Sequence, residues 1–194
     1  MTRGPYNCTG IILSAGASSR MGRHKALLDW QGQPIIAAHC ETMAQVCGRV
    51  IVVLGASAEE IRTRIPEHVD VRINPRWAET QMADSLRIGL HGVNGPCLVT
   101  PVDTPPAPTE ILERIIKPKP PVVPCFRGQD GHPVWVDASR THRSLADQTL
   151  SEVLRTAPRI SVTWPDCILS WNTPEEWGAH SSASAANRSR SKDS

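Results

Sequence analysis

Short runs rich in β-branched residues alternate along this chain with longer stretches of helical spacing. The clearest run, Arg49 to Leu54 (RVIVVL), is apolar enough to be buried in a sheet, and a stretch of helical spacing from Pro34 to Val46 precedes it. Such alternation is typical of βαβ units, in which successive strands lie parallel. The sequence therefore predicts an α/β protein of three layers with a mainly parallel central sheet.

The same pattern sets the limits of the expected elements. The predicted strands cover residues 10–13, 49–54, 69–73, 97–100, 122–126, 133–136 and 160–163, and the predicted helices cover 34–46, 58–65, 82–90, 109–116, 149–155 and 174–177. We expect the strands at 122–126 and 133–136 to pair around the turn between them. Because residues 1–8 and 178–194 lack these patterns, we expect them to be disordered and the domain to span 9–177.

Length and charge exclude several classes of protein. A chain of 194 residues suits one domain. Its 21 Lys and Arg against 19 Asp and Glu give no basic excess of the kind that nucleic-acid binding requires. No apolar run approaches the roughly 20 residues of a membrane span, and Arg3 and Pro5 stand where a signal peptide needs an apolar core. We expect a cytoplasmic protein with neither nucleic acid nor membrane as a partner.

Six cysteines are scattered without a C-x-x-C pair or a Cys/His cluster. This spacing argues against a zinc site and against a disulfide framework, so most of them are expected to be small core residues. We expect Cys8, which lies in the segment before the first predicted strand, to be an exposed free thiol.

The segment from Leu13 to Lys25 follows the first predicted strand and is rich in small residues. Glycine and serine let the backbone approach a ligand closely and turn its N–H groups inward, while Arg20 and Lys25 add two cationic ends. These features predict a loop that holds the phosphates of a nucleoside triphosphate.

Two better-known glycine loops do not fit this segment. A Walker A loop has Lys directly after its second glycine, whereas Lys25 stands three residues beyond Gly22. A dinucleotide fingerprint, G-x-G-x-x-G, has its second glycine where this chain has Ser18. The loop is therefore of a different kind.

Asp103 follows the predicted strand at 97–100, after Pro101 and Val102. Because the carboxyl ends of parallel strands meet at one edge of the sheet, its carboxylate is expected to lie beside the phosphate loop. Mg²⁺ is bound in proteins by one or two carboxylates together with phosphate oxygens and water. The sequence therefore predicts Asp103 as the metal ligand and Mg²⁺ as the cofactor.

The run LSAGASSRMGRHK resembles the signature L-[AS]-[AG]-G-x-S-x-R-M-G-x-x-K of the MobA-like nucleotidyltransferases, a family that includes molybdenum cofactor cytidylyl- and guanylyltransferases. Further matches follow in the family's order, so that the resemblance covers about residues 9 to 177. These matches are Asn74-Pro75-Arg76-Trp77, Ser85-Leu86-Arg87-Ile88-Gly89-Leu90, Pro101-Val102-Asp103-Thr104-Pro105, Gly131-His132-Pro133-Val134 and Asn172-Thr173-Pro174-Glu175-Glu176. The resemblance implies a Rossmann-like nucleotidyltransferase fold with a mixed central sheet.

The resemblance also implies a reaction: Mg²⁺-dependent transfer of a nucleoside monophosphate from a triphosphate to the phosphate of molybdopterin, with release of pyrophosphate. On this hypothesis Arg20 holds the outer phosphates, Lys25 lies near the reacting α-phosphate, and Asp103 anchors the metal; these are the predicted catalytic residues. The product would serve a molybdenum hydroxylase. The predicted nucleotide-binding residues are Leu13, Ser14, Ala15, Gly16, Ala17, Ser18, Ser19, Arg20, Met21, Gly22, Lys25, Asn74, Ser85 and Asp103.

Several positions leave alternatives open. His132 either contacts the acceptor or is a structural turn residue, and Trp77 and Trp135 either flank a planar acceptor or fill the core. Family members tend to carry Leu-Ala-Ala-Gly for CTP and Leu-Ala-Gly-Gly for GTP, so Ala15 favours CTP. Where many relatives have two aspartates, this chain has Ser170 and Asn172, which argues against a second metal site.

Three other functions stay open on the sequence. The chain could be a guanylyltransferase on the same acceptor, or a nucleotidyltransferase for a sugar or alcohol phosphate. The acids missing at 170 and 172 favour a third alternative, a nucleotide- or cofactor-binding accessory protein without turnover, whereas the intact Arg20, Lys25 and Asp103 oppose it.

Overall fold

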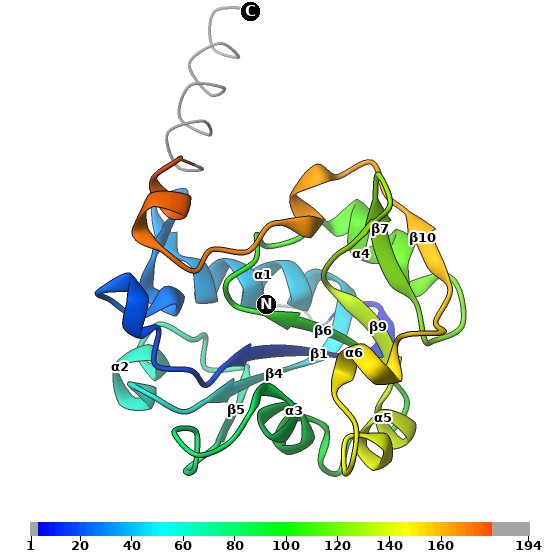
Figure 1. Ribbon diagram of the computed structural model, residues 1–194, viewed down its shortest axis with the longest axis horizontal. Coiled ribbons are helices and arrows are strands. Elements are labelled where there is room, and N and C mark those ends of the chain that lie inside the picture. Colours follow the sequence, from blue (N-terminus) through cyan, green and yellow to red (C-terminus); the bar gives the residue numbers. More distant parts are fainter. Residues whose placement is uncertain (1–3, 180–194) are drawn as a thin grey trace, which may run out of the picture.

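A five-stranded sheet forms the centre of the computed structural model, which describes residues 4–179 (Figure 1). Its strand order is β5-β4-β1-β6-β9, and all neighbours are parallel except β6 and β9. The strands are β1 (Tyr6–Ser14), β4 (Cys47–Leu54), β5 (Asp70–Ile73), β6 (Pro96–Pro101) and β9 (Val134–Asp137). The predicted mainly parallel, mixed sheet is confirmed.

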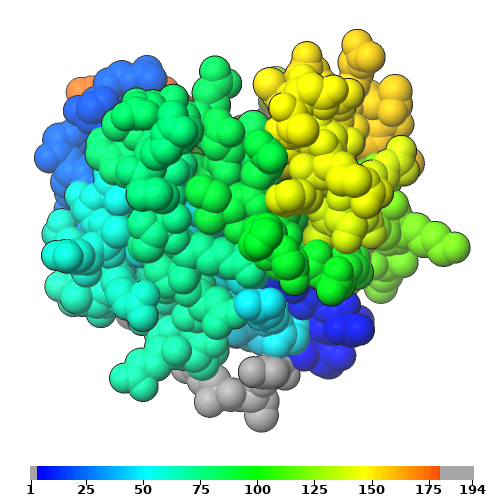
Figure 2. Space-filling model, turned by 90° about the horizontal axis from the view of Figure 1, so that it is seen from below, coloured from blue at the N-terminus to red at the C-terminus, as the bar shows by residue number. Residues whose placement is uncertain are grey.

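Helices cover both faces of this sheet (Figure 1). One face carries α1 (Ile35–Val46) and α4 (Thr109–Ile116), and the other carries α3 (Met82–Leu90) and α5 (Ala138–Ser144). Figure 2 shows the second face, with α3 in green beside the yellow segment that includes α5. Because side chains alternate along a strand, successive residues of β1 enter opposite cores: Ile12 packs beneath α1, and Ile11 packs beneath α3. The three-layer α/β fold is confirmed.

Shorter elements complete the fold around the main sheet. A second sheet, in the order β10-β7-β8, and a two-stranded ribbon, β2-β3, lie outside it. These elements are β2 (Asp29–Trp30), β3 (Gln33–Pro34), α2 (Ala58–Arg62), β7 (Val123–Phe126), β8 (Gln129–Asp130), α6 (Leu150–Val153) and β10 (Arg159–Ser161), with 3-10 turns η1 (Ser19–Met21), η2 (Lys25–Leu27) and η3 (Pro165–Ile168).

The expected hairpin of 122–126 with 133–136 is wrong. β7 pairs with β8, whereas β9 joins the main sheet beside β6, and a bridge between Val122 and Trp135 links the two segments. Residues 134–136 are all buried, so β9 gains more apolar burial inside the main sheet than in an outer hairpin. Helix α5 was not predicted, because its sequence, ASRTHRS, has few apolar residues.

The predicted disorder of residues 1–8 is wrong for 6–8, because β1 already begins at Tyr6. Cys8 is only 7% exposed and belongs to the core beneath α1, so the expectation of an exposed thiol is also wrong. The expected disordered tail at 178–194 lies outside the described residues from 180 onward, and 178 and 179 continue the helical turn that begins at 174. No helix in the described part is long and apolar enough to cross a membrane.

Candidate active site

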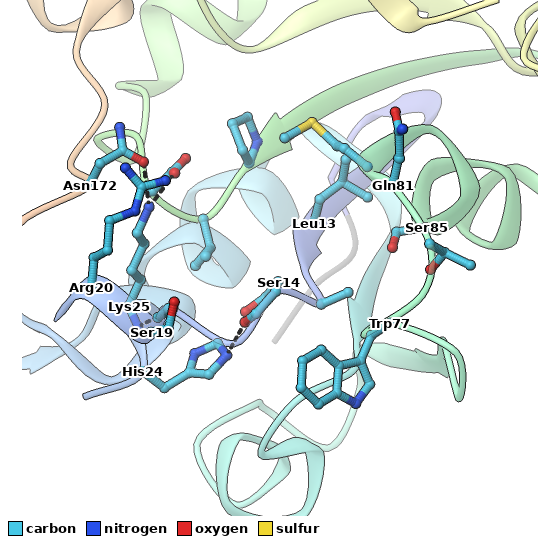
Figure 3. Close-up of a pocket in the computed structure, with 18 residues that line it drawn as sticks. Leu13, Ser14, Ser19, Arg20, His24, Lys25, Trp77, Gln81, Ser85 and Asn172 are labelled. Atoms are coloured by element: carbon cyan, nitrogen blue, oxygen red, sulfur yellow. Dashed lines mark hydrogen bonds and ion pairs between the residues drawn. The ribbon is translucent and has the colours of Figure 1, made fainter. Parts of the chain in front are cut away.

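A cleft of about 280 Å³ opens at the carboxyl ends of β1 and β6 (Figure 3). This is where the strand order of an open α/β sheet changes direction, and ligands of such folds bind there. Ten of the predicted site residues line the cleft: Leu13, Ser14, Ala15, Gly16, Ser18, Ser19, Arg20, Lys25, Ser85 and Asp103. The sheet therefore brings the phosphate loop and Asp103 to one place.

Two residues with a left-handed backbone conformation shape the phosphate loop. Ser18 has φ of 55° and Gly22 has φ of 68°, a conformation that glycine adopts readily. The Ser18 hydroxyl accepts a hydrogen bond from the backbone N–H of Lys25 at 3.0 Å. This contact folds the loop so that Lys25 returns to the mouth of the cleft.

His24, which the sequence analysis did not single out, ties the loop to its own beginning. Its Nδ1 accepts a hydrogen bond from the backbone N–H of Ala26 at 3.2 Å, so its proton is on Nε2, which donates to the carbonyl oxygen of Gly16 at 2.8 Å. Burial lowers the pKa of His24. A neutral imidazole thus spans the loop, and no local pattern in the sequence marks this contact.

Lys25 lies between two side chains from distant parts of the chain. Its Nζ donates to Asp103 Oδ2 at 2.8 Å and to Asn172 Oδ1 at 2.9 Å (Figure 3). The side chains of Lys25 and Asp103 are 14% and 21% exposed, so this ion pair is only partly accessible to water. One cation, one carboxylate and one amide oxygen therefore meet at this end of the cleft.

The Asp103 loop is held from two sides. On one side, His39 on α1 donates through Nε2 to the Thr104 carbonyl oxygen at 2.9 Å, and burial lowers the pKa of His39 to about 4. On the other side, the Asp103 carbonyl oxygen accepts from the backbone N–H of Trp171 at 2.9 Å. The second contact places Asn172, the next residue, beside Lys25.

The opposite end of the cleft is neutral and more apolar. Trp77, Gln81 and Ser85 lie there, across the cleft from Arg20 and Lys25 (Figure 3). The Trp77 side chain packs against Gly55, where an added Cβ would lie 2.6 Å from Trp77 Cβ. The cleft therefore has a cationic end suited to phosphates and a flat-walled end suited to a planar ring.

Five predicted site residues do not line the cleft. Ala17 and Gly22 are exposed on the loop, and Met21 is buried in the core. Asn74 lies behind the cleft wall at 2% exposure. His132 lies before a cis proline, and burial lowers its pKa although Asp103 counteracts this.

Other observations bear on the aromatic and metal predictions. Trp135 is buried in the core and donates to the Pro118 carbonyl oxygen, so it does not flank a ligand, whereas Trp77 does line the cleft. Within residues 4–179 no group of three or more His, Cys, Asp and Glu side chains is arranged to hold a metal. A metal here would thus take few protein ligands.

A cationic loop and a carboxylate at the carboxyl ends of parallel strands define a nucleotide-binding α/β protein. Residues 10–160 match the family model of the MobA-like NTP transferase domain. The chain therefore belongs to the MobA-like NTP transferase family and is a nucleotidyltransferase, and the resemblance noted in the sequence is confirmed.

Similar proteins and similar solved structures agree with this family assignment. The chain is 30% identical over 131 residues to the molybdenum cofactor cytidylyltransferase of Escherichia coli (strain K12), covering 65% of this chain and 68% of that protein. It is 26% identical over 186 residues to the molybdenum cofactor guanylyltransferase of Xanthomonas euvesicatoria pv. vesicatoria (strain 85-10), covering 87% and 92%. The crystal structure of Rv0371c from Mycobacterium tuberculosis H37Rv has the same fold, with a TM-score of 0.77 at 24% identity over 89% of this chain and 96% of that one.

Proposed function

We propose that this enzyme transfers CMP from CTP to the phosphate of a molybdopterin-type acceptor in a Mg²⁺-dependent reaction. An acceptor phosphate oxygen bonds to the α-phosphorus, the bond from this phosphorus to the oxygen that bridges to the β-phosphate breaks, and pyrophosphate leaves. The observation that carries the proposal is the position of Lys25, between Asp103 and Asn172 at the cationic end of the cleft.

Phosphoryl chemistry of this kind needs positioning and charge neutralisation rather than a protein nucleophile. Arg20 is exposed and lines the cleft, so its guanidinium is free to bind the outer phosphates that depart as pyrophosphate. Lys25 Nζ already hydrogen-bonds two oxygens and exchanges them for α-phosphate oxygens when the nucleotide binds. Its charge then offsets the negative charge of the reacting phosphate.

The donor set beside Lys25 fits Mg²⁺. Asp103 offers a carboxylate and Asn172 offers a neutral amide oxygen, and the hard oxygen ligands that Mg²⁺ prefers are of these types. When bound, Mg²⁺ would neutralise charge across the phosphate oxygens. The low number of protein ligands agrees with a metal that reaches the cleft together with the nucleotide.

Ala15 supports CTP as the nucleotide. It is buried at 8% exposure, and its carbonyl oxygen accepts the backbone N–H of Ala56 at 3.0 Å, so this wall of the cleft is fixed. A methyl group here narrows the space for a base and favours a pyrimidine. The name of the Escherichia coli relative supports the same nucleotide, and the names of both relatives support the acceptor. We expect a molybdenum hydroxylase to receive the product.

Pyrophosphate release tests the proposal. The purified protein would be incubated with Mg²⁺, molybdenum-loaded molybdopterin and each nucleoside triphosphate in turn, with Asp103→Ala as the inactive control. We expect release with CTP. Release with GTP alone would show that the nucleotide is GTP rather than CTP. Release only when a sugar or alcohol phosphate takes the place of molybdopterin would show that the acceptor is different. Binding of a nucleotide without release of pyrophosphate would overturn the catalytic function.

A further inference from the structure

A hydrogen-bond relay behind the cleft wall fixes the side chain of Asn74. Its Oδ1 accepts from the backbone N–H of Arg76 at 3.0 Å. Its Nδ2 donates to Thr80 Oγ1 at 2.9 Å and to Ser85 Oγ at 3.0 Å. Asn74 is only 2% exposed, so water does not compete for these contacts.

Two partners independently determine which way this amide faces. A backbone N–H can only donate, so the Asn74 atom opposite Arg76 must be the oxygen. Thr80 Oγ1 already donates its proton to the Arg76 carbonyl oxygen at 2.9 Å, so it must accept from Asn74. A flipped amide would set two donors against each other at Arg76 and two acceptors against each other at Thr80.

This orientation decides what Ser85 offers to a ligand. Its Oγ accepts the Asn74 proton, and no acceptor for the Ser85 proton is found among residues 4–179. Ser85 is 5% exposed and lines the cleft. A hydroxyl that receives a hydrogen bond from behind and lacks an acceptor turns its own proton toward the cleft.

Ser85 lies where the base of a nucleotide would be. Arg20 and Lys25 mark one end of the cleft, and Ser85 lies with Trp77 and Gln81 at the other (Figure 3). A nucleotide whose phosphates meet the two cations extends its base toward that second end. The partner of the Ser85 hydroxyl is therefore an atom of the base.

We infer that Asn74 is a positioning residue that holds the Ser85 hydroxyl as a donor, so that the nucleotide is selected by a hydrogen-bond acceptor on its base. Cytosine N3 and O2 are such acceptors, whereas an exocyclic amine or ring N–H at this point would meet another donor. The inference rests on the proposed nucleotide-binding function and adds how the base is read.

Asn74→Asp tests the inference because it reverses the relay. A carboxylate at 74 can still accept from Arg76, but it would also accept the Ser85 proton and leave only a lone pair for the base. The affinity for CTP would be measured by calorimetry in Asn74→Asp, Ser85→Ala and the double variant. Asn94→Asp, the same change on an exposed loop, is the matched control, and inorganic tripolyphosphate reports the effect of added charge without a base.

We expect Ser85→Ala to weaken CTP binding about 3- to 10-fold, the size of one lost hydrogen bond. Asn74→Asp should weaken CTP binding by a factor at least ten times larger than the factor by which it weakens tripolyphosphate binding. The reason is that the CTP complex loses one hydrogen bond and also sets one acceptor against another. In the Ser85→Ala background this extra loss should disappear. If Asn74→Asp does not fold, Asn74→Ala should cause a smaller loss that also depends on Ser85.

Equal losses of CTP affinity from the Asn74 change with and without Ser85 would overturn the inference, and so would equal losses for CTP and tripolyphosphate. These results would leave the proposed function intact, because wild-type binding of CTP would be seen. Failure of the wild-type protein to bind any nucleoside triphosphate would overturn the proposed function and this inference with it.

Discussion

The two ends of the cleft hold their ligand groups in different ways. At the phosphate end, a cation, a carboxylate and an amide from three distant segments converge, and the Lys25 and Asp103 side chains remain partly exposed. At the base end, neutral groups are fixed by buried hydrogen bonds and by close packing of Trp77 against Gly55. On the proposed function, the difference means that charge supplies the chemistry for any triphosphate, whereas hydrogen-bond direction and shape select the nucleotide.

The largest effect is expected at the phosphate end. Asp103→Ala and Lys25→Ala should each lower kcat by about 100- to 1,000-fold at saturating Mg²⁺, since each removes one preorganised charge-stabilising group. The ratio of CTP to GTP use should stay unchanged, because the base end is untouched. Arg23→Ala, an exposed cation of the same loop that does not line the cleft, is the control and should retain full activity. Steady-state rates with both nucleotides check this, and retained turnover in Asp103→Ala would contradict the assigned role.

Steric tolerance should differ between the two ends. A Cβ at Gly55 would press against Trp77 and the Ala15 carbonyl oxygen, so Gly55→Ala should lower the free energy of unfolding by about 2–3 kcal/mol. At the phosphate end, a Cβ at Gly16 meets nothing within 4 Å, and Gly16→Ala should change that free energy by less than about 0.5 kcal/mol. Urea unfolding of both variants measures the contrast, which equal destabilisation would remove.

His39, which holds the Asp103 loop at the phosphate end, should make the stability of the protein depend on pH. Burial lowers the pKa of His39 from its ordinary value of 6.5 to about 4 in the folded protein. Between pH 4 and 6.5 the unfolded chain therefore binds more protons at this residue than the folded protein does. Stability is therefore complete above pH 6.5 and falls as the pH drops toward 4, by about 2 kcal/mol between pH 7 and 5 from this residue.

His39→Gln keeps a donor for Thr104 and removes the titrating group, so its stability should fall less over the same range. The burial-lowered pKa values of His24 and His132 act in the same direction and persist in the variant. Urea unfolding at the two pH values compares the slopes. Identical slopes for the variant and the wild type would show that His39 is not kept neutral by the fold.

The smallest effect is expected from Asn172→Asp. A second carboxylate beside Lys25 raises the negative charge offered to a cation, so the Mg²⁺ concentration for half-maximal rate should fall about 2- to 5-fold. Titration of activity with Mg²⁺ measures this, with Asn94→Asp as the control for an added distant charge. A higher Mg²⁺ requirement in Asn172→Asp would show that Asn172 does not face the metal.

Much of the fold followed from local patterns. The strand before the phosphate loop, helix α1 and the position of Asp103 at the end of β6 agree with the sequence prediction, because each depends on a short run of residues. The pairing of β9 did not follow, since a strand that reads as one half of a hairpin can be buried better elsewhere. Cys8 was misplaced because nothing in residues 6–8 signals that β1 begins as early as Tyr6, which pairs with Cys47 of β4.

By itself the sequence determined the α/β alternation, the small residues and cations of the loop, and the carboxylate that accompanies them. Tertiary structure alone decided which partners these groups have. Asn172 reaches Lys25 across 147 positions, and His39 reaches Thr104 across 65. The direction of the Ser85 proton likewise depends on Asn74, Arg76 and Thr80 acting together. Residue types fix which groups can donate or accept, but the direction of a hydrogen bond is set only when folding brings its partners together.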